Sequence, residues 1–254
     1  MTSGAILAGG HSTRFGDTDK SVAELGGVPM VRRVADRLLG TVEPMPPGAA
    51  HASDGTSVVT DLVISCRPEQ QPLIATALEG VGDEDGTAVP VRWALDREPD
   101  QGPVAGIRNA CQTASDNVLV VVACDMPFVD PAFLASLVAD LDGVGDAATG
   151  GRQPYDAVIP KLDDQWLQTT QAAYRSDPME TACARALARG DRKLTAPLEE
   201  IHYRIVDDET VRSRTTTQTF TNVNTPTQRR AAESRILSAE TAMRNGDHDV
   251  ENDQ

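Results

Sequence analysis

The chain has 254 residues, enough for one α/β domain or two small ones with a substantial hydrophobic core. Acidic residues outnumber basic ones 38 to 23, and the net charge of −15 argues against a nucleic-acid partner, which needs a basic surface. No stretch approaches the roughly 18 apolar residues of a membrane span, and the first apolar run is too short for a signal peptide, so we expect no membrane partner and no export.

The acidic excess is accompanied by a shortage of lysine, since only Lys20, Lys161 and Lys193 occur. Such a surface repels itself in dilute buffer, and strong salt screens the repulsion because the Debye length falls to about 3 Å at 1 M. We interpret the composition as that of a salt-adapted, halophilic protein. An ordinary acidic cytosolic protein is the alternative.

The four cysteines, Cys66, Cys111, Cys124 and Cys183, form no Cys-x-x-Cys pair and have no histidine close by in the sequence. This spacing favours neither a zinc site nor a disulfide framework. Reduced, mostly buried thiols are typical of a cytoplasmic protein, which is the location that we expect.

Strand-like apolar runs alternate with helical patterns in the first part of the chain. This alternation predicts an α/β fold, three-layer and Rossmann-like, with a mostly parallel sheet and helices on both faces. The expected strands are Gly4–Leu7, Asp61–Ser65, Val89–Leu95 and Val118–Ala123. The expected helices are Pro29–Leu39, Pro68–Leu78, Pro103–Thr113 and Pro131–Leu141, each beginning near a proline, which first helical turns tolerate.

The pattern changes at the glycine-rich stretch 143–152. Further strands are expected at Asp156–Pro160, His202–Val206 and Gln218–Val223, and further helices at Pro178–Ala188 and after Thr225, the expected N-cap. We therefore expect a single domain over 1–244, with halves of about 1–142 and 143–244. Pro44–Thr60 is interpreted as a surface loop insertion, and the acidic tail 245–254 as disordered.

The first strand runs into a glycine-rich segment that carries two cations, Leu7-Ala-Gly-Gly-His-Ser-Thr-Arg-Phe-Gly-Asp-Thr-Asp-Lys20. Glycine backbones approach a ligand closely and expose N–H donors that suit phosphate oxygens, while Arg14 and Lys20 add positive charge. The spacing is neither that of a Walker A loop nor that of a dinucleotide fingerprint. A tight turn with two solvated cations is the alternative.

Three later segments complete a pattern with the first: Asp96-Arg-Glu-Pro-Asp-Gln-Gly-Pro-Val-Ala-Gly106, Val120-Val-Val-Ala-Cys-Asp-Met-Pro127 and Phe220-Thr-Asn-Val-Asn-Thr-Pro226. In this order and at these separations, the four segments resemble the molybdenum cofactor guanylyltransferases (MobA) of the nucleotidyltransferase superfamily. The resemblance covers the chain from about Gly4 to the helix after Pro226.

This resemblance implies a nucleotidyltransferase fold and an Mg²⁺-dependent transfer of GMP from GTP to molybdopterin, with release of pyrophosphate. It also implies molybdoenzymes or other cofactor-biosynthesis proteins as partners. One alternative is a sister nucleotidyltransferase that uses CTP or another acceptor, such as a cobamide precursor or a sugar phosphate; Asp19 disfavours it. The other alternative is a non-catalytic nucleotide-binding regulator, against which the intact Lys20, Asp96 and Asp125 argue.

The resemblance also assigns roles to individual residues. The catalytic residues are Lys20, Arg14 and Asp125, with Asp125 as the metal ligand. The nucleotide-binding residues are Leu7, Ala8, Gly9, Gly10, Lys20, Ser65, Asp96, Gly102 and Asp125, and the acceptor-binding residues are Asn222 and Asn224. Independently of the resemblance, Asp125 follows an apolar strand, and a carboxylate at the carboxyl end of a parallel strand suits Mg²⁺.

Each of these assignments has a structural alternative. Asp125 and Asp96 are also suited to capping a turn or loop, and Arg14 to a surface ion pair with Asp17 or Asp19. Asn222 and Asn224 alternate along an expected strand and so share one face. Their amides are suited to a phosphate, a second metal or the pterin, or simply to pairing with backbone groups at the strand end.

Two positions bear on the choice of base. The resemblance implies GTP because CTP-using relatives usually have alanine where this chain has Gly9. Ser65 departs from the pattern, since it stands where bacterial relatives have a base-contacting asparagine, and a hydroxyl cannot make the paired contact of an amide. Either the backbone of Leu7–Gly9 chiefly holds the guanine, or base specificity is looser in this chain.

Stability and activity should both rise between about 0.1 M and 1 M KCl, because screening of the acidic surface outweighs the weaker phosphate binding expected in salt. Thermal unfolding and transfer rates over a KCl series measure both effects. A melting temperature that stays flat or falls over this range would contradict the salt adaptation.

Overall fold

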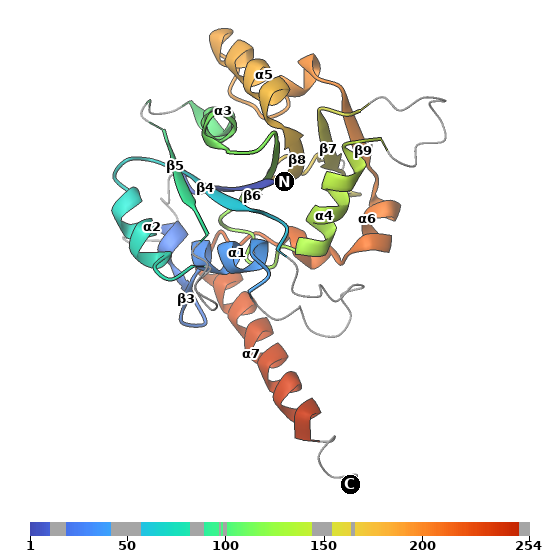
Figure 1. Cartoon of the computed structure of the whole chain (residues 1–254). Helices are drawn as coiled ribbons and strands as arrows, with labels where there is room; N and C mark the ends of the chain where they lie inside the picture. Colours follow the sequence, from blue (N-terminus) through green and yellow to red (C-terminus); the bar gives the residue numbers. More distant parts are fainter. Residues whose placement is uncertain are drawn as a thin grey trace.

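The computed structural model describes residues 1–10, 19–41, 57–81, 89–96, 98, 101–143, 154–163 and 166–248, with side chains described as far as Ser238. A seven-stranded sheet in the order β5-β4-β1-β6-β8-β7-β9 forms the middle layer (Figure 1). Its strands are β1 (Ser3–Leu7), β4 (Asp61–Cys66), β5 (Val91–Leu95), β6 (Val118–Ala123), β7 (Ala157–Pro160), β8 (Gln171–Arg175) and β9 (Tyr203–Val206). Within this sheet β8 alone runs antiparallel to its neighbours.

Helices cover both faces of the sheet (Figure 1). Helices α3 (Gly102–Thr113) and α5 (Ser176–Ala188) lie on one face, and α1 (Met30–Leu38), α2 (Gln71–Ala77), α4 (Pro131–Asp140) and α6 (Asp208–Arg214) on the other. Neighbouring residues of a strand point to opposite faces, so Ile64 belongs to the core beneath α1 and α2, while Val63 belongs to the core beneath α3 and α5. The α/β class with helices on both faces is therefore confirmed.

The remaining elements lie at the edges of this framework. They are the 3₁₀ helices η1 (Lys20–Val22), η2 (Pro197–Glu200) and η3 (Thr217–Phe220), the hairpin of β2 (Glu24–Leu25) and β3 (Val28–Pro29), and α7 (Pro226–His248). Helix α7 begins beside the hairpin and projects away from the sheet (Figure 1). Thr225 caps it, since Thr225 Oγ1 accepts a hydrogen bond from the Gln228 amide at 3.2 Å, which confirms the expected cap.

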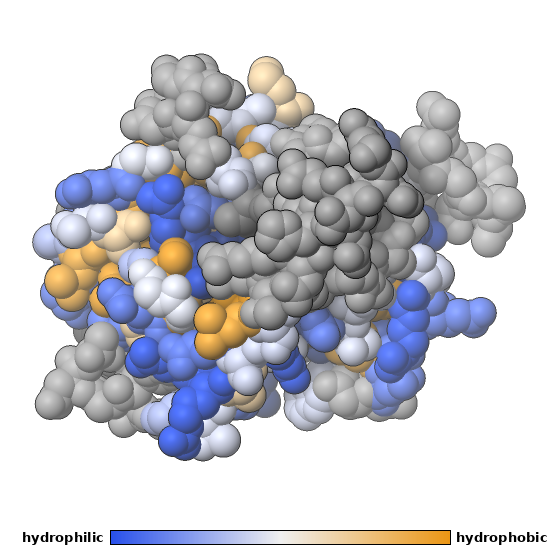
Figure 2. All heavy atoms as spheres, turned by 90° about the horizontal axis from the view of Figure 1, so that it is seen from below, coloured by the Kyte–Doolittle hydropathy of each residue, from blue (hydrophilic) through white to orange (hydrophobic). Residues whose placement is uncertain are grey.

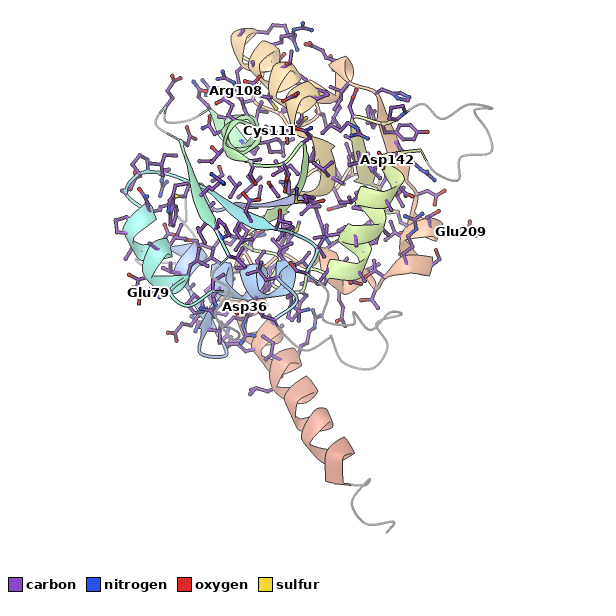
Figure 3. The ribbon with its side chains drawn as sticks, viewed as in Figure 1. Asp36, Glu79, Arg108, Cys111, Asp142 and Glu209 are labelled. Atoms are coloured by element: carbon purple, nitrogen blue, oxygen red, sulfur yellow. The ribbon has the colours of Figure 1, made fainter. Side chains whose placement is uncertain are left out.

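Three polar side chains hold α5 against α3. Arg108 Nε lies 3.1 Å from Glu180 Oε1, and Gln112 Nε2 donates to the same oxygen at 2.8 Å. Figure 3 shows Arg108 and Cys111 on α3. This packing matters for the site because the segment after α5 reaches back over the beginning of α3.

The expected strand at Gln218–Val223 is wrong. Residues 217–220 form η3, and residues 221–224 belong to no strand. The hydroxyl oxygen of Thr219 accepts hydrogen bonds from the Asp130 backbone amide at 2.9 Å and from Gln171 Nε2 at 2.5 Å. These bonds tie the segment to the N-cap of α4 and to β8 through a side chain, in place of a ladder of backbone bonds to a neighbouring strand.

The sequence analysis missed β8, α6 and the β2–β3 hairpin, and its boundaries for the other elements differ from the observed ones by up to three residues. Of the Pro44–Thr60 insertion, residues 57–60 lead into β4, and the rest lies outside the described residues. Helix α7 continues to His248, so the first part of the tail expected to be disordered is helical, while residues 249–254 lie outside the described residues.

The surface agrees with the polar composition. Where the face in Figure 2 is coloured, hydrophilic side chains predominate and hydrophobic ones lie in smaller areas between them. In the part of the chain that the structure describes, no helix combines the length and apolar character needed to cross a membrane.

All four cysteines are buried and free, as expected. Burial raises the pKa of Cys66, Cys124 and Cys183 to about 12 and that of Cys111 further. The folded protein should therefore react slowly with a thiol-specific disulfide reagent at about pH 8, because reaction requires an accessible thiolate. The same protein in denaturant should titrate all four thiols within the mixing time; rapid reaction of the native protein would contradict the burial.

Candidate functional site

A pocket of about 940 Å³ opens at the carboxyl ends of β1, β4 and β5. In an open parallel sheet, ligands bind at this edge. They bind most often at the strand from which the chain builds one side of the sheet and to which it later returns to build the other side. Strand β1 is in that position, since the chain passes from it to β4 on one side and later to β6 on the other. The lining residues are Leu7, Gly9, Gly10, Ser65, Arg67, Pro68, Glu69, Asp96, Glu98, Gly102, Pro103, Gly106 and Arg192.

Most of the residues expected to bind a nucleotide meet in this pocket: Leu7, Gly9, Gly10, Ser65, Asp96 and Gly102 all line it. Ala8 lies beneath the surface with an exposed fraction of 3%. Lys20 and Asp125 are not among the lining residues and form a separate cluster. Arg14 lies outside the described residues.

The backbone at the end of β1 is largely engaged within the protein. The Leu7 carbonyl accepts a hydrogen bond from the Cys124 amide at 3.0 Å, and the Ala8 amide donates to the Ser65 carbonyl at 2.8 Å. The Ala8 carbonyl accepts a third bond, from Gln70 Nε2 at 3.0 Å. Gly9, the remaining residue of the expected Leu7–Gly9 segment, takes part in none of these three bonds.

Two glycines allow α3 to approach the pocket. A Cβ added to Gly106 would lie 3.0 Å from Ser65 Oγ, so α3 packs directly against the end of β4. Gly102 has a φ of +70°, and a Cβ there would lie 3.2 Å from the Arg192 carbonyl oxygen. Only glycine adopts this conformation readily and leaves space for the segment that carries Arg192.

Sequence reasoning missed Arg192, which comes from the half of the chain assigned to the acceptor and yet lines the pocket beside Gly102. Its signal in the sequence is only a basic residue shortly after the glycine that ends a helix. The packing of α5 on α3 places it there, and no local pattern reports such a contact.

The pocket holds charges of both signs. Arg67 Nε lies 2.9 Å from Glu69 Oε1, and partial burial raises the pKa of Asp96, with a further rise from the negative charge of Glu98. Asp96 Oδ1 accepts a hydrogen bond from the Glu98 amide at 3.3 Å, so the expected loop cap is present together with the pocket position. Carboxylates accept hydrogen bonds and guanidinium groups donate them, so the pocket can match a base that carries both kinds of group.

The second cluster joins three distant parts of the chain. Lys20 Nζ, in η1, lies 2.6 Å from Asp125 Oδ2 and donates a hydrogen bond to Asn224 Oδ1. The Val223 amide donates to the Asp125 carbonyl at 2.9 Å, which fixes the segment before α7 beside the end of β6. The side chains of Lys20 and Asp125 are mostly buried, with exposed fractions of 18% and 16%.

Asn224 therefore lies at the Lys20–Asp125 pair. The argument that Asn222 and Asn224 share one face of a strand is wrong, because residues 221–224 are not a strand. Asn222 is half-buried. Its acceptor-binding role stays a prediction.

The residues around Asp125 fit a hard divalent cation. Asp125 Oδ1 is buried without a hydrogen-bond partner among the described residues, so this oxygen is left for another ligand. The described residues contain no group of three or more His, Cys, Asp or Glu side chains arranged to hold a metal. Mg²⁺ commonly binds through one or two carboxylates, with the remaining ligands supplied by substrate phosphates and water.

The fold and this arrangement define the class of protein as nucleotidyltransferase-like. The molybdopterin-guanine dinucleotide biosynthesis protein A of Archaeoglobus fulgidus superposes with a TM-score of 0.62 at 26% identity, covering 93% of this chain and 98% of that one. A nucleotidyl transferase from Methanothermobacter reaches the same TM-score at 15% identity, with 94% and 99% covered, and supports the fold alone.

Residues 4–204 match the MobA-like NTP transferase domain, and the chain belongs to this family. A probable molybdenum cofactor guanylyltransferase of the haloarchaeon Natronomonas pharaonis is 35% identical over 92% of this chain and 97% of its own. A protein of the same description from Haloferax mediterranei, also a haloarchaeon, is 32% identical over 91% and 93%. These two sources favour the halophilic interpretation of the acidic surface.

Proposed function

We propose that this chain transfers GMP from GTP to molybdopterin and releases pyrophosphate. The observation that carries the proposal is the meeting of Lys20, Asp125 and Asn224 beside a nucleotide-sized pocket at the carboxyl edge of the sheet. Relatives that align over nearly the whole chain are described as molybdenum cofactor guanylyltransferases, which supports the same reaction.

In this reaction an oxygen of the molybdopterin phosphate attacks the α-phosphorus of GTP, and the bond between the α-phosphorus and the bridging oxygen to the β-phosphate breaks. Negative charge accumulates on the departing pyrophosphate, and a positioned cation stabilises it in the transition state. Lys20 is the cation that we assign to the β- and γ-phosphates, together with Arg14. Asn224 accepts a hydrogen bond from the Lys20 ammonium and helps to orient it.

We assign a single Mg²⁺ to Asp125. When bound, the ion neutralises phosphate charge, and Asp125 supplies the protein's carboxylate to it. The Asp125 oxygen that is not bonded to Lys20 is the one suited to this role. One carboxylate, that of Asp125, would thus serve both the Lys20 ammonium and the ion.

The same proposal includes binding of molybdopterin by Asn222 and Asn224 and by the half of the chain from about residue 143. It also includes a cytoplasmic location and delivery of the product to molybdoenzymes or other proteins of cofactor biosynthesis. The two halves are not strictly separate in this proposal, because Arg192 belongs to the second half and lines the nucleotide pocket.

With GTP, Mg²⁺ and molybdopterin the protein should release pyrophosphate, and without molybdopterin it should not. Asp125→Asn should lower this rate by on the order of 10²-fold or more, because the amide keeps the shape but loses the charge that holds the ion. Asp142→Asn is the control, since Asp142 pairs with Arg175 on the surface. If Asp125→Asn kept most of its transfer at saturating Mg²⁺, the metal assignment would be wrong.

GTP should be used in preference to CTP and ATP. Guanine presents two donors on one edge and two acceptors on another, and the pocket offers the carboxylates of Asp96 and Glu69 and the guanidinium groups of Arg67 and Arg192. Ser65 supplies one hydroxyl in place of a paired amide contact, so we expect the preference to be smaller by about 1–3 kcal/mol but not reversed. Parallel rate measurements with the three nucleotides decide this, and a CTP rate equal to or above the GTP rate overturns the assignment.

A further inference from the structure

We propose that Gln70 is a positioning residue that fixes Lys20 and the end of β1 in one geometry, so that the lysine and the nucleotide pocket act on the same triphosphate. The inference rests on the proposed nucleotidyl transfer but concerns a residue outside all four sequence segments that indicated that activity. Gln70 lies in the turn before α2 and is 2% exposed.

The side-chain amide of Gln70 is bonded on three sides. Its Nε2 donates to the Ala8 carbonyl at 3.0 Å and to Asp19 Oδ2 at 2.7 Å, and its Oε1 accepts from the Arg67 amide at 3.0 Å. Ala8 and Asp19 lie on the two sides of Gly9, Gly10 and Arg14 in the sequence. One buried amide therefore joins both ends of the glycine-rich segment to the turn that carries Arg67 into the pocket.

Asp19 passes this constraint on to Lys20. Asp19 Oδ1 accepts hydrogen bonds from the Ser21 amide at 2.9 Å and from Ser21 Oγ at 2.7 Å, and so caps η1, which begins at Lys20. One oxygen of the Asp19 carboxylate therefore orients η1, and the other oxygen is held by Gln70. A small displacement of a catalytic group costs much of its effect, because transfer depends on positioning.

The amide is required here because it both donates and accepts. A glutamate has nearly the same shape but donates no hydrogen bond when ionised, and it would face Asp19 with a second negative charge. Repulsion between two carboxylates at this distance raises the pKa of one of them, and the Arg67 guanidinium, which lies 3.9 Å from Asp19 Oδ2, partly opposes the rise. In Gln70→Glu the missing donor should therefore return when the pH falls below that raised pKa.

The experiment measures GTP affinity by titration and transfer rate at about pH 8 and about pH 5.5, on either side of the raised pKa and above the ordinary carboxyl values. At the higher pH, Gln70→Glu should lose about 10- to 100-fold in kcat, the cost of a displaced catalytic group. At the lower pH, the ratio of variant to wild-type rate should rise several-fold.

Two further variants separate positioning from folding. Asp19→Asn combined with Gln70→Glu restores a donor opposite an acceptor between residues 19 and 70, but not the bond to the Ala8 carbonyl. Asparagine still caps η1, so this double variant should recover part of the rate at about pH 8 and lose the acid-dependent gain. Gln70→Met should be slow at both pH values. Gln71→Met is the matched control and should leave the rate unchanged, because Gln71 begins α2 next to Gln70 but its side chain takes part in none of these bonds.

Melting temperatures are recorded for every variant. The inference is overturned if Gln70→Met keeps the wild-type rate, or if Gln70→Glu is equally slow at both pH values and Asp19→Asn does not improve it. A wild-type protein that binds GTP but does not transfer GMP would instead contradict the proposed function. In that case the role of Gln70 is tested by the GTP affinities of the same variants. We expect these affinities to show the same pH dependence as the rates.

Discussion

The ion pair of Lys20 with Asp125 is the interaction on which the rest of the site depends. Both groups are mostly removed from water, so the pair contributes only if its geometry and remaining hydrogen bonds are well satisfied. Asn224 accepts from the ammonium, and the backbone bond from Val223 holds that asparagine beside Asp125. Removing Asp125 or Asn224 would take one of these partners away from the Lys20 ammonium, which is mostly buried.

The sheet explains why the pair forms where it does. Strands β1 and β6 are direct parallel neighbours, with Leu7 opposite Ala123, so the residues that follow each strand emerge side by side. Strand β4 stands on the other side of β1 with Ser65 opposite Leu7, which brings the second wall of the pocket to the same edge. The registers of β1 with its two neighbours thus fix how far the Lys20–Asp125 pair lies from the pocket.

Much of this arrangement could be predicted from the sequence, because buried parallel strands are continuous apolar runs and polar residues mark their ends. Asp125 and Asp96 were located in that way. Strand β8 could not be found, since Gln171-Ala-Ala-Tyr-Arg175 has little strand propensity and is a strand only because β6 and β7 bury it from both sides. Gln70 and Arg192 were missed for a related reason: their contacts are tertiary, and no local spacing reports them.

The position of Asn224 late in the chain has a consequence during synthesis. Domains generally fold as units, and in this chain β1, β4, β5 and β6 are all synthesised before Asn224. A nascent chain that has not reached Val223 has Lys20 and Asp125 but neither the amide nor the backbone bond that holds them. The cluster of Lys20, Asp125 and Asn224 can therefore be completed only near the end of translation.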